Sequence, residues 1–169
     1  MKSSTQLIDA LRDKTLEQIE RLDSLIVKIP DDKPEWQPVD STLPLTDLLG
    51  HLLECLAGFC AVLYALRPRQ LSHFPHLRAL PVNQPRKATD ARQLMEIYRQ
   101  HLEQGFALLT DDDLSIKVST VFVPAGESVL TLLLGNLEHL LNHKYQLFFY
   151  LKMLGVAVAS QDLYQFRGE

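Results

Sequence analysis

Two histidines four residues apart, His139 and His143, lie in a leucine-rich segment near the end of the chain. On an α-helix this spacing places both imidazoles on one face, one turn apart. A third histidine, His51, lies in another apolar segment far upstream. Three imidazoles from two helices are enough protein ligands to hold a zinc or nickel ion with coordination positions left open. Because neutral imidazoles leave the ion its full charge, it could acidify a bound water or polarise a substrate atom.

Residues one helical turn from His51 could take part in the same site. Glu54 and Cys55 follow it by three and four positions. A carboxylate could orient a coordinating imidazole through its second ring nitrogen, or act as a general base, so we favour Glu54. A thiolate would make the site softer and more structural in character.

The segment that holds the histidine pair also carries a row of polar side chains between leucines. An unsatisfied polar group in a protein interior costs about 1 to 3 kcal/mol, so a buried polar row requires partners, and a metal ion is one. The row follows helical spacings of three and four: Gly135, His139, Asn142, His143, Gln146 and Tyr150.

Two alternatives stand beside the metal site, because a histidine on a helix is more often an ordinary hydrogen-bonded group than a ligand. In the first, the protein is a non-catalytic bundle that binds a metal or small ligand, or dimerises. In the second, the three histidines are ordinary polar groups of the core. The other histidines, His73, His76 and His101, are interpreted as structural or exposed. The sequence contains no glycine-rich phosphate loop, GxSxG, CxxC or HExxH motif.

Four segments have the apolar spacing that is typical of amphipathic or buried helices. We expect helices at about 5–28, at about 43–67 with a cap at Ser41 or Thr42, and at about 127–154. The third helix follows Thr89 and ends at the aspartates 111–113. These four helices predict an all-α bundle that forms a single domain over the whole chain.

Two further segments lack a helical pattern. Residues 68–88 contain several prolines and no period, which predicts a long connection rather than a fifth helix. Such a connection is long enough to cross the whole bundle, so the helices it joins need not be antiparallel. Residues 114–128 are β-branched and alternating, and could form a short hairpin before the last helix.

Composition limits the class of protein. The formal net charge is −4, from 17 basic and 21 acidic side chains, which argues against a nucleic-acid partner. The chain has no uninterrupted apolar stretch long enough for a membrane helix, and its first residues lack the pattern of a signal peptide, so we expect a cytoplasmic protein. Cys55 and Cys60 are badly placed for a bridge on one helix and are expected to be buried, reduced thiols.

The sequence around the three histidines resembles the DinB-like superfamily, also called the YfiT-like metal-dependent hydrolases. The resemblance lies in Trp36, in LTDLLGHLLE around His51, in HLLNHKYQ, and in the YLKMLGV that ends the last helix. It implies a four-helix bundle with up-down-down-up topology, in which the 68–88 connection is the crossover between the second and third helices.

The resemblance also implies a ligand set. The three metal-binding histidines of the family would correspond to His51, His139 and His143, and its usual glutamine to Gln146. Glu54 and Gln146 are then the candidate catalytic residues, and the bound ion is expected to be nickel or zinc.

One departure from the family pattern concerns the two residues before that glutamine. Many members have Arg-Gly there, whereas this chain has Lys144 and Tyr145. Members with assigned reactions include transferases that join a low-molecular-weight thiol to an electrophile, and a thiol-dependent isomerase. The expected function is therefore a metal-dependent hydrolase or thiol transferase that acts on a small molecule and can use such a thiol as cosubstrate. The family often forms dimers, and spare apolar side chains on the first helix and the C-terminal tail make a homodimer the expected assembly.

Overall fold

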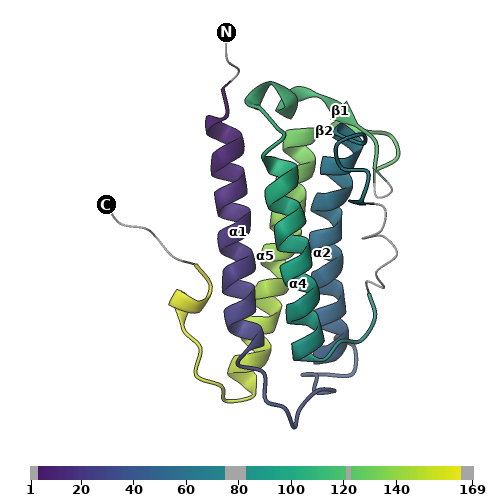
Figure 1. Cartoon of the computed structure of the whole chain (residues 1–169). Helices are drawn as coiled ribbons and strands as arrows, with labels where there is room; N and C mark the ends of the chain where they lie inside the picture. The colour runs from purple at the N-terminus through teal and green to yellow at the C-terminus, as the bar shows by residue number, and fades with distance from the viewer. Residues whose placement is uncertain (1–3, 75–82, 121–122, 165–169) are drawn as a thin grey trace.

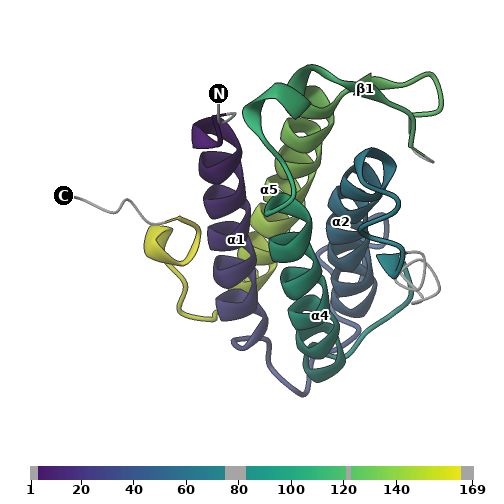
Figure 2. The same cartoon turned by 45° about the horizontal axis from the view of Figure 1, so that its top comes forward.

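Four long helices lie side by side in the computed structural model, which describes residues 4–74, 83–120 and 123–164. Figures 1 and 2 both show α4 on one side and α5 on the other side of the pair α1 and α2, and each of α4 and α5 contacts both α1 and α2. The helices are α1 (Gln6–Ile26), α2 (Leu45–Leu66), α4 (Ala88–Phe106) and α5 (Val129–Met153).

The helices follow the up-down-down-up order. In Figure 1, α1 and α5 run in one direction, and α2 and α4 run in the other. The parallel pair, α2 and α4, is joined by the crossover, whose residues 75–82, with His76, lie outside the described part of the chain. The predicted all-α bundle and its topology are confirmed.

Helix α2 is the most buried of the four helices, which agrees with its apolar sequence. It is long and apolar enough to cross a membrane, but most of it is buried inside the bundle, which is usual for the core helix of a soluble protein. The predicted cap at Ser41 or Thr42 is wrong, since Pro44 is the N-cap residue. Backbone carbonyls of the preceding loop take its place: Leu45 N donates to Trp36 O at 3.0 Å, and Thr46 N donates to Pro34 O at 3.2 Å.

The aspartates expected to end the third helix have other roles. Helix α4 already ends at Phe106, and a 3-10 helix, η1 (Asp111–Ser115), follows. Asp111 caps α1 across the bundle, because its Oδ1 accepts hydrogen bonds from Leu7 N and Ile8 N at 3.0 Å each. Asp113 pairs with Arg67 at the end of α2, with Nη2 2.6 Å from the carboxylate. Both contacts fix the end of the bundle where η1 lies.

Helix α5 begins two residues later than predicted. Glu127 and Ser128 form strand β2 (Glu127–Ser128), which pairs antiparallel with β1 (Lys117–Val118) as the short predicted hairpin. Ser128 is the N-cap residue, and its side chain accepts from Thr131 N at 3.2 Å. Gly155 follows the end of the helix, with a φ of 78° that favours glycine.

Candidate metal centre

The three predicted ligands meet between α2 and α5. Nε2 of His51 lies 3.0 Å from Nε2 of His143 and 3.2 Å from Nε2 of His139. Ligand atoms of all three residues lie within 4.8 Å of one another. The spacing of four in α5 and the packing of α5 on α2 therefore bring together all three histidines, as the sequence predicts.

These separations suit coordination of one small cation. Zinc–imidazole bonds are about 2.0–2.1 Å long, so two ligands at a tetrahedral angle lie about 3.4 Å apart, and two at a right angle lie about 2.9 Å apart. The observed 3.0 and 3.2 Å fall between these values. Three histidine ligands would leave coordination positions of such an ion open.

The outer nitrogen of His51 faces two oxygens. Its Nδ1 lies 3.0 Å from Oε2 of Glu54 and 3.0 Å from Oδ1 of Asn83. Both oxygens accept hydrogen bonds, so the hydrogen of the neutral ring lies on Nδ1. The lone pair of Nε2 then points at the other two histidines.

A chain of hydrogen bonds fixes the tautomer of His143 in the same way. The carbonyl of Leu43 can only accept, so the hydroxyl of Tyr150 donates to it at 3.0 Å. The hydroxyl oxygen accepts from Nε2 of Gln146 at 3.0 Å, which turns the amide oxygen of Gln146 toward Nδ1 of His143 at 2.9 Å. Nδ1 therefore carries the hydrogen, and Nε2 presents its lone pair.

These directions place two unprotonated nitrogens, Nε2 of His51 and Nε2 of His143, 3.0 Å apart. Two lone pairs at this distance repel each other unless a proton or a metal cation lies between them. Outer hydrogen bonds of this kind are also what holds metal-ligating histidines in their tautomer and orientation. The donor set therefore fits a divalent metal ion.

Burial keeps the histidine pair of α5 in the neutral form that binds metals. Desolvation lowers the pKa of His139, and the nearby His51 lowers it further. Desolvation also lowers the pKa of His143, although its hydrogen bond with Gln146 acts in the opposite direction. Metal ions compete with protons for imidazole, so a lowered pKa favours metal binding at neutral pH.

Cys55 does not join the histidines. Its side chain is buried, and burial together with the charge of Glu54 raises the pKa of its thiol to about 12. Cys60 is also buried, so both cysteines are unreactive thiols, as expected. His73 and His101 lie near each other at a ring-centroid distance of 5.0 Å, and neither belongs to the group of possible ligands.

Fewer residues of the polar row on α5 face the interior of the bundle than the sequence predicts. Gly135 and Asn142 are exposed, whereas Asn136 is partly buried against α2. A Cβ at Gly58 would lie 2.6 Å from Oδ1 of Asn136, so Gly58 makes room for this amide. Asn136 precedes His139 by three residues, and the helical period alone could have found it.

Asn83 also contacts the candidate metal centre, and no sequence pattern predicts it. It belongs to the crossover, 32 positions after His51, and no local pattern connects the two. Only the path of the crossover beside α2 brings its side chain to the imidazole.

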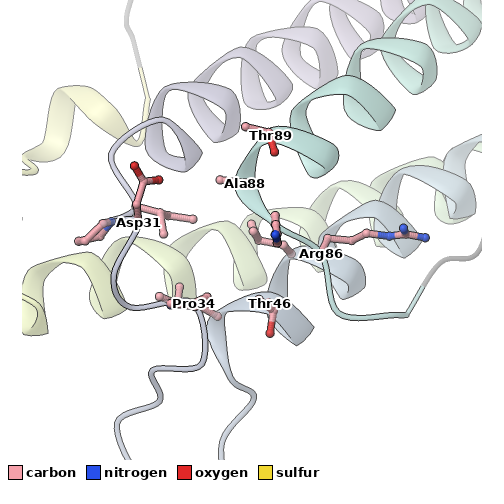
Figure 3. A pocket seen from close by; sticks show the side chains of 11 residues that line it. Asp31, Pro34, Thr46, Arg86, Ala88 and Thr89 are labelled. Carbon is pink, nitrogen blue, oxygen red and sulfur yellow. The ribbon is translucent and has the colours of Figure 1, made fainter.

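A pocket of about 400 Å³ lies elsewhere, at the starts of α2 and α4 (Figure 3). Asp31, Thr46, Arg86 and Thr89 are among the residues that line it, and none of the predicted site residues does. This pocket is therefore separate from the metal centre.

Comparison with known proteins supports the fold. No family model and no curated protein sequence matches this chain. The crystal structure of a DinB-like protein, YjoA, from Bacillus subtilis is similar with a TM-score of 0.66 and 21% sequence identity, over 88% of this chain and 94% of that chain. The similarity confirms the DinB-like fold that the sequence resemblance predicts.

Proposed function

We propose that this protein is a DinB-like metal enzyme in which His51, His139 and His143 bind one nickel or zinc ion. The observation that carries the proposal is the approach of the Nε2 atoms of His51 and His143 to 3.0 Å, while Nδ1 of each ring faces a side-chain oxygen. A metal cation is a partner that suits such an arrangement. The similar fold of YjoA is consistent with the proposal.

The contacts of both candidate catalytic residues favour roles in orienting the histidines. Glu54 contacts Nδ1 of His51, and Gln146 contacts Nδ1 of His143, each on the side of the ring that faces away from the Nε2 cluster. In these positions they hold the imidazoles in place rather than contact a substrate. We therefore propose that Glu54 and Gln146 are positioning residues.

This assignment favours a low-molecular-weight thiol over water as the nucleophile. A divalent ion at the three histidines would supply the acidification that a bound nucleophile needs near neutral pH. A thiol has a pKa of about 8.5 and water one of about 15.7, so the thiol needs the smaller shift and no separate general base. The sulfur would form a bond to an electrophilic carbon, the leaving group would depart with the bonding electrons, and the thiol proton would pass to solvent.

The first test is elemental analysis of untagged protein purified without chelator. We expect about one equivalent of nickel or zinc in the parent and none in the His139→Ala, His143→Ala double variant. Conjugation of a chromogenic electrophile to each of several low-molecular-weight thiols, with and without metal, then tests the reaction. Metal-dependent ester or amide hydrolysis without conjugation would make the protein a hydrolase instead. One equivalent of metal without any turnover would leave a non-catalytic metal-binding bundle.

We also propose a cytoplasmic homodimer. Leu7 and Tyr164 are exposed on the first helix and the tail, and the outer side of α5 adds Tyr145, Phe149 and Met153, of which Met153 is 60% exposed. Apolar groups that gather on one helix face are typical of association surfaces. Sedimentation of the parent should give a dimer, and Phe149→Lys should give a monomer with unchanged helix content. A monomeric parent would contradict the proposal.

A further inference from the structure

We propose that Asn83 is a positioning residue for His51 and that the end of the crossover serves to place it. This inference rests on the proposed metal centre. The side-chain oxygen of Asn83 lies 3.0 Å from Nδ1 of His51, on the same nitrogen that Glu54 contacts at 3.0 Å. The hydrogen on Nδ1 is thus shared by one oxygen from α2 and one from the crossover.

The backbone of the crossover is held against α2 where Asn83 needs it. Asn83 N donates to Gly50 O at 3.2 Å, and Arg86 N donates to Thr46 O at 2.9 Å. Gly50 and Thr46 lie one turn apart on α2, so residues 83–86 run along the first two turns of that helix. His51 directly follows Gly50 in the chain.

Gly50 allows this approach because it has no side chain. A Cβ at this position would lie 2.1 Å from the carbonyl oxygen of Gln84 and 2.9 Å from its nitrogen. These are backbone atoms, which cannot rotate away as the end of a flexible side chain could. The glycine that precedes the metal ligand is therefore what lets the crossover come within reach of the imidazole.

Asn83 itself adopts an unusual backbone conformation. Its φ of 56° lies in the left-handed region, where it is the one described residue other than glycine. Asparagine tolerates this region better than most residues, and glycine tolerates it best. Glycine would satisfy the backbone at this position, so the presence of asparagine is explained by its side-chain contact with His51.

Oxygens that accept from a metal-bound histidine set the orientation of its ring and increase its basicity, and their loss typically lowers metal affinity at least tenfold. Glu54 is the charged member of the pair of acceptors. Asn83 contributes a neutral oxygen from a segment that is remote in the sequence. It therefore couples the path of the crossover to the geometry of the metal centre.

Asn83→Gly tests the role of the side chain without straining the backbone. With zinc alone as the probe, in competition with a chromophoric chelator, we expect about a tenfold loss of affinity. The unfolding temperature of the metal-free variant should be no lower than that of the parent, because glycine accepts the positive φ. Asn83→Asp retains an acceptor oxygen and should bind zinc about as tightly as the parent.

Gly50→Ala is the second variant. Its Cβ would push the backbone of Gln84 away from α2, so zinc affinity should fall although Asn83 is intact. Unchanged zinc affinity in Asn83→Gly would overturn the inference.

A measurement on the metal-free protein separates this inference from the proposed function. Nitrogen-15 NMR of His51 should show the hydrogen on Nδ1, and its exchange with solvent should be faster in Asn83→Gly than in the parent. If the parent binds no metal, the proposed function fails, and this exchange rate alone decides the role of Asn83. Equal exchange rates in parent and variant would refute it.

Discussion

The hydroxyl of Tyr150 should control metal binding although it does not touch the metal centre. Tyr150→Phe removes the one oxygen that joins the carbonyl of Leu43 to the amide of Gln146. Without it, the amide of Gln146 can rotate and present its NH2 group to His143. The ring of His143 is then no longer held with its hydrogen on Nδ1, and its Nε2 can carry the hydrogen instead.

The size of the effect follows from the hydrogen bonds lost. Tyr150 is 4% exposed and makes two hydrogen bonds of 3.0 Å through its hydroxyl. At about 0.5 to 1.5 kcal/mol each, their loss should lower the free energy of unfolding by about 1 to 3 kcal/mol. The edge contact of its ring with Trp36, at a centroid distance of 5.4 Å, remains in phenylalanine. Metal affinity should fall by at most about tenfold, the lower end of the loss that follows removal of a ligand's direct partner, because Gln146 itself remains.

The assay compares two variants that each lose one tyrosine hydroxyl. Tyr145→Phe removes a hydroxyl from the same helix, but Tyr145 is 48% exposed. Urea unfolding of the metal-free proteins measures stability, and competition with a chromophoric chelator measures zinc affinity. We expect Tyr145→Phe to match the parent in both measurements.

One outcome would contradict the role of the Tyr150 hydroxyl in metal binding. If Tyr150→Phe unfolds more easily but binds zinc as tightly as the parent, the hydroxyl stabilises the fold without setting the tautomer of His143. The chain of hydrogen bonds from Leu43 would then not be what keeps Nε2 of His143 unprotonated.

Two further predictions concern the stability of the bundle. Gly58→Ala should be less stable than Gly135→Ala, because its Cβ meets the amide of Asn136 at an overpacking cost of about 1 to 3 kcal/mol, whereas Gly135→Ala has open space and should raise the free energy of unfolding by about 0.5 to 1 kcal/mol. Equal stability of the two variants in urea would contradict this. Burial raises the pKa of Asp113, but hydrogen bonds from Arg67 and Thr110 outweigh it and leave the pKa lowered. Asp113→Asn should therefore cost about 1.5 to 3 kcal/mol at pH 7, and the cost should shrink as the pH falls below about 3.9 and vanish below the lowered native pKa. A cost that persists in acid would exclude the charge as its source.

The parts of the molecule that sequence could predict are those set by local periodicity. Spacings of three and four identify the four helices and place His139 and His143 on one face. The position of His51 opposite this pair depends on which helices are neighbours, and here the family resemblance supplied the answer. Helix ends are predicted less well because distant groups cap them. Asp111, for example, caps α1 from about a hundred residues away, which no local pattern encodes.

The difference between local periodicity and distant contacts also explains which site residues the sequence could predict. Glu54 and Gln146 each follow a ligand by three positions, so the helical period places them beside it, although it cannot choose between orienting and acid–base roles. Their contacts with Nδ1 atoms favour orienting roles. Asn83 reaches His51 only through the crossover, and its contact depends on Gly50 and on a left-handed backbone. A long connection leaves such a contact undetermined by sequence spacing.

The departure from the family pattern at Lys144 affects packing rather than the ligands. Successive helical residues are rotated by about 100°, so Lys144 points away from the cluster that His143 joins. It is 2% exposed, and its ammonium donates to the side-chain oxygen of Gln18 on α1 and to the carbonyl of Leu163 in the tail. Burial lowers its pKa to about 8. An ion pair between Lys28, which lies just after α1, and Asp162, at 2.6 Å, also holds the tail. The lysine thus holds the C-terminal tail against α1, on the opposite side of α5 from α2, and leaves the three-histidine centre intact.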